Sequence, residues 1–211
     1  SPGAVSADGR YAAFTSLASQ LVPDDGNGTS DVFLCDLWNG TNVLVSVNTN
    51  GGGGNGASLE ATLSADGRFV AFFSQATDLV EGVTNSRGNV FLRDVWSNTT
   101  VLVSANLAGQ GANGASRHPV ISADGCRVAY ESAATDLAPD HTDGYVDIFV
   151  YDRLAGTNAL VSTRTNAPFA SADVARPLIS DEGRFVIFAG HSLLKSLFAR
   201  DLMLEETTTV Y

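Results

Sequence analysis

Glu60, His118 and Arg176 occupy equivalent places in the chain, each 58 residues after the one before. A carboxylate, an imidazole and a guanidinium that meet at one point could bind a small anion or the end of a peptide. The same side chains could equally form a polar lining that binds nothing. We treat them as a candidate ligand-binding set at the mouth of a channel, which the repeat described below would create.

Oxygen-bearing side chains cluster in two further loops. The candidate ligands are Asp25, Asn27 and Asp31 in the first loop, and Asp140, Asp143 and Asp147 in the second. Calcium prefers clustered carboxylates and carbonyls, but neither loop has the spacing of an EF-hand. Turns in a solvated loop explain these residues without a metal. Calcium is therefore the one cofactor that the sequence admits, and we otherwise expect none.

No catalytic motif accompanies these residues. The chain has three histidines, and none has a nucleophile partner that the sequence reveals. A Gly-x-Ser-x-Gly motif is also missing. Four aspartates could be mistaken for paired catalytic carboxylates, but they recur with the repeat. A residue that every repeat carries is usually structural. These aspartates are Asp36, Asp94, Asp152 and Asp201, which we expect to pair with Arg10, Arg68 and Arg184. We predict that the protein is not an enzyme.

A repeat of 58 residues organises the whole chain. Ser6-Ala-Asp-Gly-Arg10 returns at Ser64 and Ser122, and in degraded form at Ser180. Asp31-Val-Phe-Leu-Cys-Asp36 and Val43-Leu-Val-Ser46 return with the same step. The fourth copy of the Asp31 motif arrives nine residues early, so the last repeat is shortened. Self-similarity at such a period is typical of a solenoid, a propeller or a modular array.

Each repeat contains four β-strand signals and no sustained helical period. Asp-Gly after the first strand predicts a tight turn. The strands are apolar on both faces, which indicates sheets covered on both sides, as in a propeller. We therefore predict one all-β domain, a β-propeller over residues 1–211 with four blades of four antiparallel strands. The blades span about 1–46, 47–104, 105–162 and 163–211. We expect them to close as a four-bladed ring; the alternatives are that they belong to a larger propeller or associate with copies of the same chain.

Aromatic residues recur in register on the second and third strands of the repeat. We expect them to be buried between blades: Phe14, Phe72, Tyr130 and Phe188, with Phe33, Phe91, Phe149 and Phe198. Two cysteines, Cys35 and Cys126, fall in different repeats and at different positions of the repeat. Non-adjacent blades rarely bring Cα atoms within the roughly 7 Å that a disulfide needs, so we predict free thiols.

The pattern Ser-Ala-Asp-Gly-Arg-aromatic-Val-Ala-Phe, then Asp-Val-Phe-x-x-Asp-Leu, then Leu-Val-Ser, resembles the TolB-like, WD-like propeller repeat of bacterial proteins. The resemblance covers essentially the whole chain. It implies the fold, but such repeats serve as scaffolds, receptors and enzyme appendages. Known members are mostly bacterial and exported. We therefore expect an extracellular or cell-surface location, with the periplasm as the alternative.

The charge of the chain excludes several partners. The net charge is −11, the pI is about 4.4, and Lys195 is the only lysine. A face that binds nucleic acid needs clustered Lys and Arg, so we expect no nucleic-acid partner. No apolar run approaches the roughly 20 residues that cross a bilayer, so we expect no membrane insertion.

Three classes of function follow from these observations. The first is a non-catalytic exported structural or interaction protein that self-assembles as a homo-oligomer or filament, through blade edges or Gly-rich loops. The second is a module that binds a glycan or peptide partner on one propeller face, for which Trp38 and Trp96 on equivalent hairpins are the candidate platform. The third is the appendage domain of a hydrolase.

Overall fold

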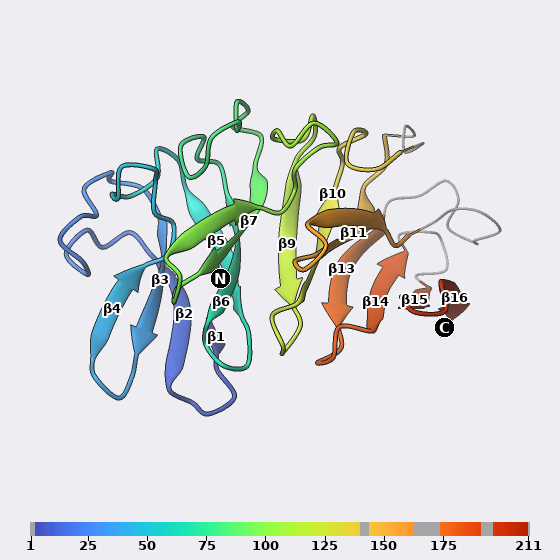
Figure 1. The fold of residues 1–211 in the computed structure, drawn as a ribbon, viewed down its shortest axis with the longest axis horizontal. Helices are drawn as coiled ribbons and strands as arrows, with labels where there is room; N and C mark the ends of the chain where they lie inside the picture. The colour runs from blue at the N-terminus through green and yellow to red at the C-terminus, as the bar shows by residue number, and fades with distance from the viewer. Residues whose placement is uncertain (1–2, 140–143, 163–173, 191–195, 211) are drawn as a thin grey trace.

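The computed structural model describes residues 3–139, 144–162, 174–190 and 196–210, and all helical or strand structure in them is β-strand. Sixteen strands form four antiparallel sheets. Within each sheet the strands lie side by side in chain order (Figure 1). The prediction of an all-β propeller with four blades of four antiparallel strands is confirmed.

Each blade uses the strands of one repeat. Blade 1 contains β1 (Ala4–Val5), β2 (Tyr11–Ser16), β3 (Asp31–Asp36) and β4 (Thr41–Leu44). Blade 2 contains β5 (Ser58–Leu63), β6 (Phe69–Ser74), β7 (Asn89–Asp94) and β8 (Thr99–Leu102). Blade 3 contains β9 (Ser116–Ile121), β10 (Arg127–Ser132), β11 (Asp147–Asp152) and β12 (Thr157–Leu160). Blade 4 contains β13 (Val174–Ile179), β14 (Phe185–Gly190), β15 (Leu197–Asp201) and β16 (Glu206–Thr209).

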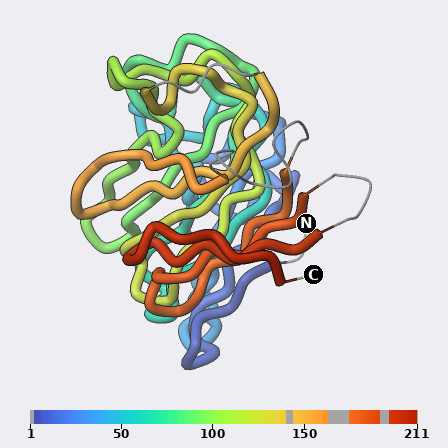
Figure 2. The backbone as a smooth tube through the Cα atoms, turned by 90° about the vertical axis from the view of Figure 1, so that its right-hand side faces the viewer, coloured from blue at the N-terminus to red at the C-terminus, as the bar shows by residue number. Residues whose placement is uncertain are grey.

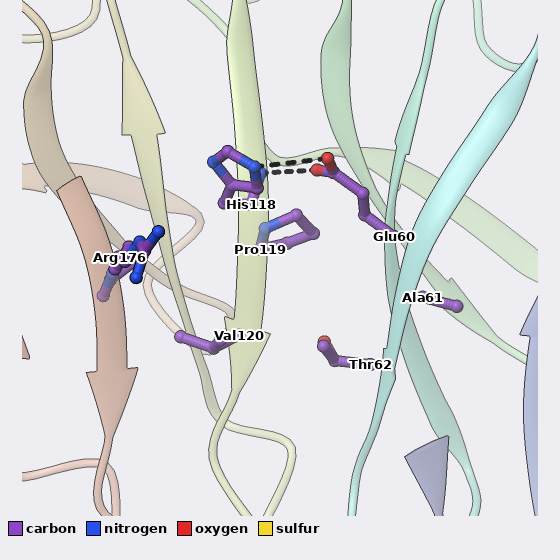
Figure 3. Close-up of a pocket in the computed structure, with 8 residues that line it drawn as sticks. Glu60, Ala61, Thr62, His118, Pro119, Val120 and Arg176 are labelled. Atoms are coloured by element: carbon purple, nitrogen blue, oxygen red, sulfur yellow. Dashed lines mark hydrogen bonds and ion pairs between the residues drawn. The ribbon is translucent and has the colours of Figure 1, made fainter. Parts of the chain in front are cut away.

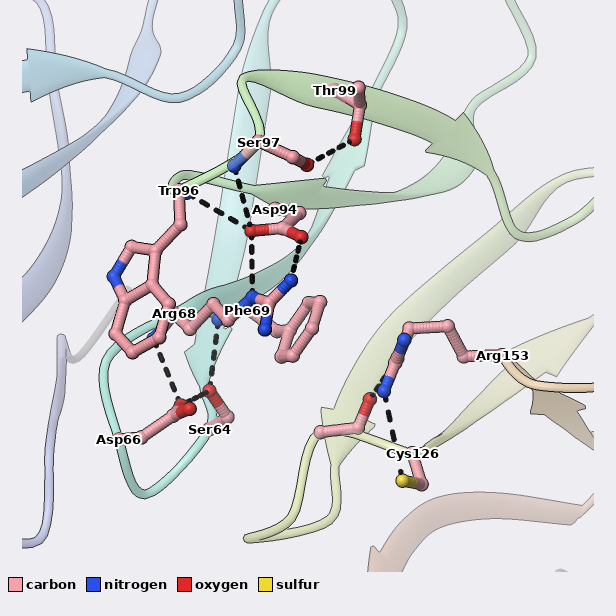
Figure 4. A network of polar contacts seen from close by, with 11 residues as sticks. Ser64, Asp66, Arg68, Phe69, Asp94, Trp96, Ser97, Thr99, Cys126 and Arg153 are labelled. Carbon is pink, nitrogen blue, oxygen red and sulfur yellow. Dashed lines mark hydrogen bonds and ion pairs between the residues drawn. The ribbon is translucent and has the colours of Figure 1, made fainter.

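The turn between the first two strands explains the strongest motif of the repeat. In blade 2, the Ser64 hydroxyl donates to Asp66 and accepts the backbone N–H of Phe69. Asp66 also accepts the backbone N–H of Arg68 at 3.0 Å (Figure 4). Gly67 has φ of +76°, a conformation that glycine adopts without a Cβ penalty. The motif therefore encodes a self-contained turn.

The recurring arginines and aspartates pair as expected. The nitrogen–oxygen distances are 2.7 Å for Arg10–Asp36, 2.7 Å for Arg68–Asp94 and 2.6 Å for Arg184–Asp201. Hydrogen bonds from Arg184 lower the pKa of Asp201 to about 2, and the same arrangement holds the pKa of Asp36 and of Asp94 well below the usual range. Each pair joins the second strand to the end of the third, so these aspartates are structural.

Blade 3 lacks the pair because Cys126 stands where the other blades have arginine. Asp152 lies 3.5 Å from Arg127 instead. Arg153 donates to the carbonyl of Gly125 and lies over the ring of Phe69 in blade 2, with 4.2 Å from its Cζ to the ring centroid (Figure 4). A different arginine thus links blade 3 to its neighbour.

Hydrophobic cores lie between successive blades. One cluster joins blades 1 and 2, a second joins blades 2 and 3, and a third joins blades 3 and 4. Within each blade, the aromatic residues of the second and third strands stack with ring centroids 5.6–5.9 Å apart. Burial between blades is confirmed for six of the eight predicted aromatic residues: Phe72, Phe91, Tyr130, Phe149, Phe188 and Phe198. Phe33 is also fully buried, but it belongs to none of the three inter-blade clusters of the described residues.

Phe14 is the exception, since it is only half-buried. Its ring lies on the face of blade 1 that points away from blade 2. No hydrophobic cluster of the described residues joins this face to blade 4. The prediction of burial was therefore wrong for Phe14, whereas Phe33, which stacks on it, is fully buried without a preceding blade.

The four blades form an open row and not the ring that we expected. Strands of blades 1 and 2, 2 and 3, and 3 and 4 pack on each other, whereas no strand of the described part of blade 4 packs extensively on blade 1. Figure 1 shows the row from β1–β4 to β13–β16, and Figure 2 views it with blade 4, in red, nearest the reader. The number of repeats does not decide closure, because side chains between the sheets set the angle from blade to blade.

Candidate functional site

The three residues of the candidate ligand-binding set share an unusual backbone conformation. Glu60 has φ of +57°, His118 of +52° and Arg176 of +58°. Positive φ is uncommon for residues other than glycine and costs free energy, and such strain often marks functional sites. Each residue lies where the pairing of the first and second strands of its blade shifts register. A β-bulge of this kind redirects a side chain.

The first strand of blade 3, β9, contacts both β5 and β13, so its bulge lies between the other two (Figure 3). The His118 Nε2 lies 3.4 Å from Glu60 Oε1. The backbone N–H of His118 also donates to Glu60 Oε2 at 2.8 Å. The structure therefore brings Glu60 and His118 into direct contact across two blades.

A fourth residue, Glu131 on β10, completes the network. Its Oε2 lies 3.0 Å from His118 Nδ1 and 3.2 Å from Arg117 Nε. Its Oε1 accepts the backbone N–H of Arg176 at 2.7 Å. Glu131 is 2% exposed, so a buried carboxylate holds the bulges at His118 and Arg176.

Glu131 was missed by sequence analysis, although a signal was present. The equivalent positions in the other blades hold Thr15, Phe73 and Ala189. When one blade has a charged residue where the other blades have uncharged ones, a polar partner is expected close to that residue. We searched for residues that recur with the period, and Glu131 breaks it.

An open pocket of about 390 Å³ lies over these bulges (Figure 3). Its lining residues are Glu60, Ala61, Thr62, His118, Pro119, Val120, Arg176 and Pro177. In the described part of the chain, the guanidinium of Arg176 has no ion-pair partner. The pocket thus combines apolar walls with one free cationic group and a carboxylate–imidazole pair.

A hydroxyl, that of Thr62, lines the pocket, but it is not paired with the histidine. Among the described residues, His118 bonds Glu60 and Glu131, and no Ser, Thr or Cys side chain is hydrogen-bonded to it. Histidine-based nucleophilic catalysis needs such a partner in hydrogen-bond reach. The arrangement is suited to holding a ligand by charge and shape.

Three of the four candidate calcium ligands in the described residues serve the framework of the repeat. The Ser46 hydroxyl donates to Asp31 at 2.6 Å, and Ser162 donates to Asp147 at the same distance. Asn27 donates to the carbonyl of Gly54, as the equivalent Asn85 in blade 2 does to Ala112. Asp140 and Asp143 lie outside the described residues. Asp25 belongs to no such repeated contact.

The exposed tryptophans stack on arginine. Arg10 lies over the Trp38 ring and Arg68 over the Trp96 ring, each with its Cζ 5.1 Å from the centroid (Figure 4). The tryptophans are 69% and 63% exposed. Because each guanidinium also pairs with an aspartate, each ring is held in place on the surface of its blade.

Three further features concern the cysteines, metal-binding clusters and membrane spans. Cys35 and Cys126 are free and half-buried, as expected. Within the described ranges, no group of three or more His, Cys, Asp and Glu side chains has the arrangement of a metal site. No helix there has the length and apolar character needed to span a membrane.

Comparisons with known proteins agree on the fold. No protein-family model matches the chain, and no curated protein does. Among solved structures, a putative TolB from Agrobacterium tumefaciens is 17% identical with a TM-score of 0.61, over 98% of this chain and 63% of that one. TolB from Acinetobacter baumannii is 15% identical with a TM-score of 0.59, over 100% and 43%.

The propeller domain of the Trilobed protease from Pyrococcus furiosus, described as having an open velcro topology, is 11% identical with a TM-score of 0.58. The match covers 100% of this chain and 57% of that one. This chain therefore spans less than two thirds of each of these structures. At such identities the likeness shows the fold alone, and that fold is a TolB-like β-propeller.

Proposed function

From this TolB-like propeller fold, we propose that the chain is a non-catalytic interaction protein that associates head to tail with a second copy of itself. The free face of blade 4 on one copy would dock on the free face of blade 1 on the other. Its acidic, lysine-poor composition suits an exported setting, outside the cell or in the periplasm.

One observation carries the proposal: the described residues contain two unmatched halves of a further inter-blade core. Leu63, Ile121 and Ile179 are equivalent, and each packs against the core between its blade and the preceding one. Their counterpart in blade 1 is Val5, which is 61% exposed. No preceding blade packs on Val5, so its side chain stays exposed.

Blade 4 offers the complementary half. Val45, Val103 and Val161 are equivalent, each at most 1% exposed within the core toward the following blade. Their counterpart Val210 is 44% exposed. Phe185 is 38% exposed, whereas its blade 2 equivalent, Phe69, is 4% exposed. Exposed apolar surface of this kind is typical of interaction sites.

Backbone hydrogen bonds extend the same pattern. The Ala7 N–H donates to Ala65, Ala65 donates to Ala123, and Ala123 donates to Asp181, at 2.9–3.0 Å. The next bond in this series would run from Asp181 of one copy to Ala7 of the other. Two copies would form eight blades, which is within the usual range for closed propellers. If the rotation did not close, the same contact would propagate as a filament.

We predict that light scattering at high concentration will show a species of at least twice the 22.0 kDa chain mass. Val5→Lys and Val210→Asp should each weaken association by at least about 100-fold, because each leaves a buried charge unpaired. An equimolar mixture of the two variants should associate again, since lysine then meets aspartate at one contact and the other contact is unchanged.

Leu154→Asp is the matched control, because Leu154 is 75% exposed on a blade 3 hairpin and lies on neither face. It should associate as the wild type does. A wild-type monomer at high concentration, or single variants that associate normally, would defeat the proposal. A monomer would favour a longer chain or an attached domain as the cover for these faces.

A second function, peptide binding, is favoured by the pocket over the three bulges. Three residues with positive φ line it, and Arg176 has no ion-pair partner among the residues described. Apolar walls from Pro119 and Val120 would accommodate an extended segment. We propose that the segment carries a carboxylate that pairs with Arg176.

We predict that a fluorescein-labelled Gly-Glu-Glu-Gly peptide binds at low salt, as measured by anisotropy. Arg176→Ala should weaken binding about 5- to 10-fold, as expected for one partly solvated charge pair. Arg200→Ala, which removes an arginine of β15 that does not line the pocket, should leave affinity unchanged. Equal effects of both variants would reduce the binding to general attraction of charge.

A further inference from the structure

Asp25 is a buried carboxylate without a partner. It is 4% exposed, its Oδ1 is inaccessible to solvent, and that atom has no hydrogen-bond partner. No donor from the described residues reaches its other oxygen either, and no arginine or histidine there pairs with it. An isolated charge in such a place is strongly unfavourable unless a cation or a proton compensates it.

The orphaned oxygen lies beside Gly53 and the side chain of Asn27. A Cβ placed on Gly53 would lie 3.3 Å from Asp25 Oδ1 and 3.0 Å from Asn27 Cγ, with the Asn27 amide nitrogen nearer still, so the two side chains meet beside this glycine. Thr29 Oγ1, four residues after Asp25, is a second buried oxygen without a partner. Two unsatisfied oxygens in one short loop indicate a missing ligand.

The negative charge of Asp25 acts on a second carboxylate, that of Asp31. Asp31 is fully buried, and its pKa is raised by burial and by the negative charges of Asp25 and Asp78. Hydrogen bonds from Ser46 and Asn27 oppose this rise without neutralising the charge. A cation between Asp25 and Asp31 would relieve both carboxylates.

The repeat itself does not require an acid at this place. Blade 2 has Val83 at the position of Asp25, and Val83 is 5% exposed within the core between blades 1 and 2. An apolar side chain therefore suits the framework here. The aspartate of blade 1 is a costly departure from the repeat, which a bound ligand would explain.

We propose that the loop from Asp24 to Asp31 binds one Ca²⁺ through Asp25, with Asp31, Thr29 and main-chain carbonyls supplying further oxygens. Oxygen-only donors select hard cations. An irregular loop suits the flexible coordination of Ca²⁺ better than the strict octahedron of Mg²⁺. With two carboxylates the affinity belongs with extracellular modules, in the range of about 10⁻⁴–10⁻³ M. The proposal does not depend on self-association or peptide binding.

The test is thermal unfolding of chelator-treated protein in 0–10 mM CaCl₂, with ionic strength held constant by NaCl. The wild-type midpoint should rise by about 3–6 °C, because calcium well above its dissociation constant stabilises the folded chain, which alone has the site. Asp25→Val, which installs the blade 2 residue, should remove the response. Glu81→Gln removes one carboxylate from the equivalent loop of blade 2, and this variant should keep the calcium response.

Asp25→Asn serves as a second variant that preserves the shape of the side chain, and it should also lose the response. Calorimetric titration should give one site in the wild type and none in either variant. A wild-type midpoint that does not move, together with an Asp25→Val midpoint that is higher without calcium, would show that Asp25 binds no calcium and only destabilises the fold. An equal calcium response in Asp25→Val and wild type would place the ion elsewhere. Either result overturns the proposal.

Discussion

Replacing Phe72 with alanine should lower the free energy of unfolding by about 3–5 kcal/mol. Phe72 is fully buried in the core between blades 1 and 2, and its ring stacks on Phe91 with centroids 5.7 Å apart. Truncation removes that apolar burial and leaves a cavity between two sheets. Urea unfolding at neutral pH, followed by circular dichroism, measures the change.

Phe14→Ala is the matched control, because Phe14 holds the same position in blade 1 but is only half-buried. It should cost less than about 2 kcal/mol when the protein is dilute enough to be a single chain. If copies associate through this face, the cost should grow with protein concentration. An equal cost for both variants in dilute protein would contradict the open row.

Replacing Glu131 with alanine should lower the free energy of unfolding by about 2–3 kcal/mol. The change leaves the N–H of Arg176 without its acceptor and removes the acceptor shared by His118 and Arg117. We place the cost below that of a fully buried ion pair, since the side chains of His118 and Arg117 are each 50% exposed and regain water. The same urea experiment measures it.

Glu60→Ala provides the comparison, because Glu60 contacts the same histidine but its side chain is 28% exposed. It should cost less than about 1 kcal/mol, as partly solvated pairs usually do. If Glu131→Ala were no more destabilising than Glu60→Ala, Glu131 would not be the buried centre of the network.

The sequence was sufficient to predict blade number, strand order and the interior of the blades. A strict period places Phe72, Tyr130 and Phe188 at equivalent positions, and equivalent positions in stacked sheets experience the same neighbours. The turns were also predictable, since Asp66 and Gly67 meet a local requirement that no distant residue alters. Features that depend only on the side chains of one blade are local, and such features can be predicted from a sequence.

Closure and site geometry were less accessible. The angle between blades depends on how facing side chains fill the space, so Val5 and Val210 could not be recognised as uncovered. The bulge at Glu60 leaves no distinctive trace, because positive φ is usually associated with glycine. Periodicity also directed attention to residues that recur, and away from Asp25 and Glu131, whose importance lies in their not recurring.

An open row of blades has a thermodynamic consequence. Each blade touches only its neighbours, so the stability of the chain approximates a sum of blade terms and nearest-neighbour terms, as in a one-dimensional lattice. Blades 2 and 3 each have two such neighbours, whereas blades 1 and 4 each have one. Fraying should therefore begin at the ends of the row, and amide hydrogen exchange should be slowest in β6 and β10. A row of this kind can gain or lose whole 58-residue units during evolution without disturbing the contacts that remain.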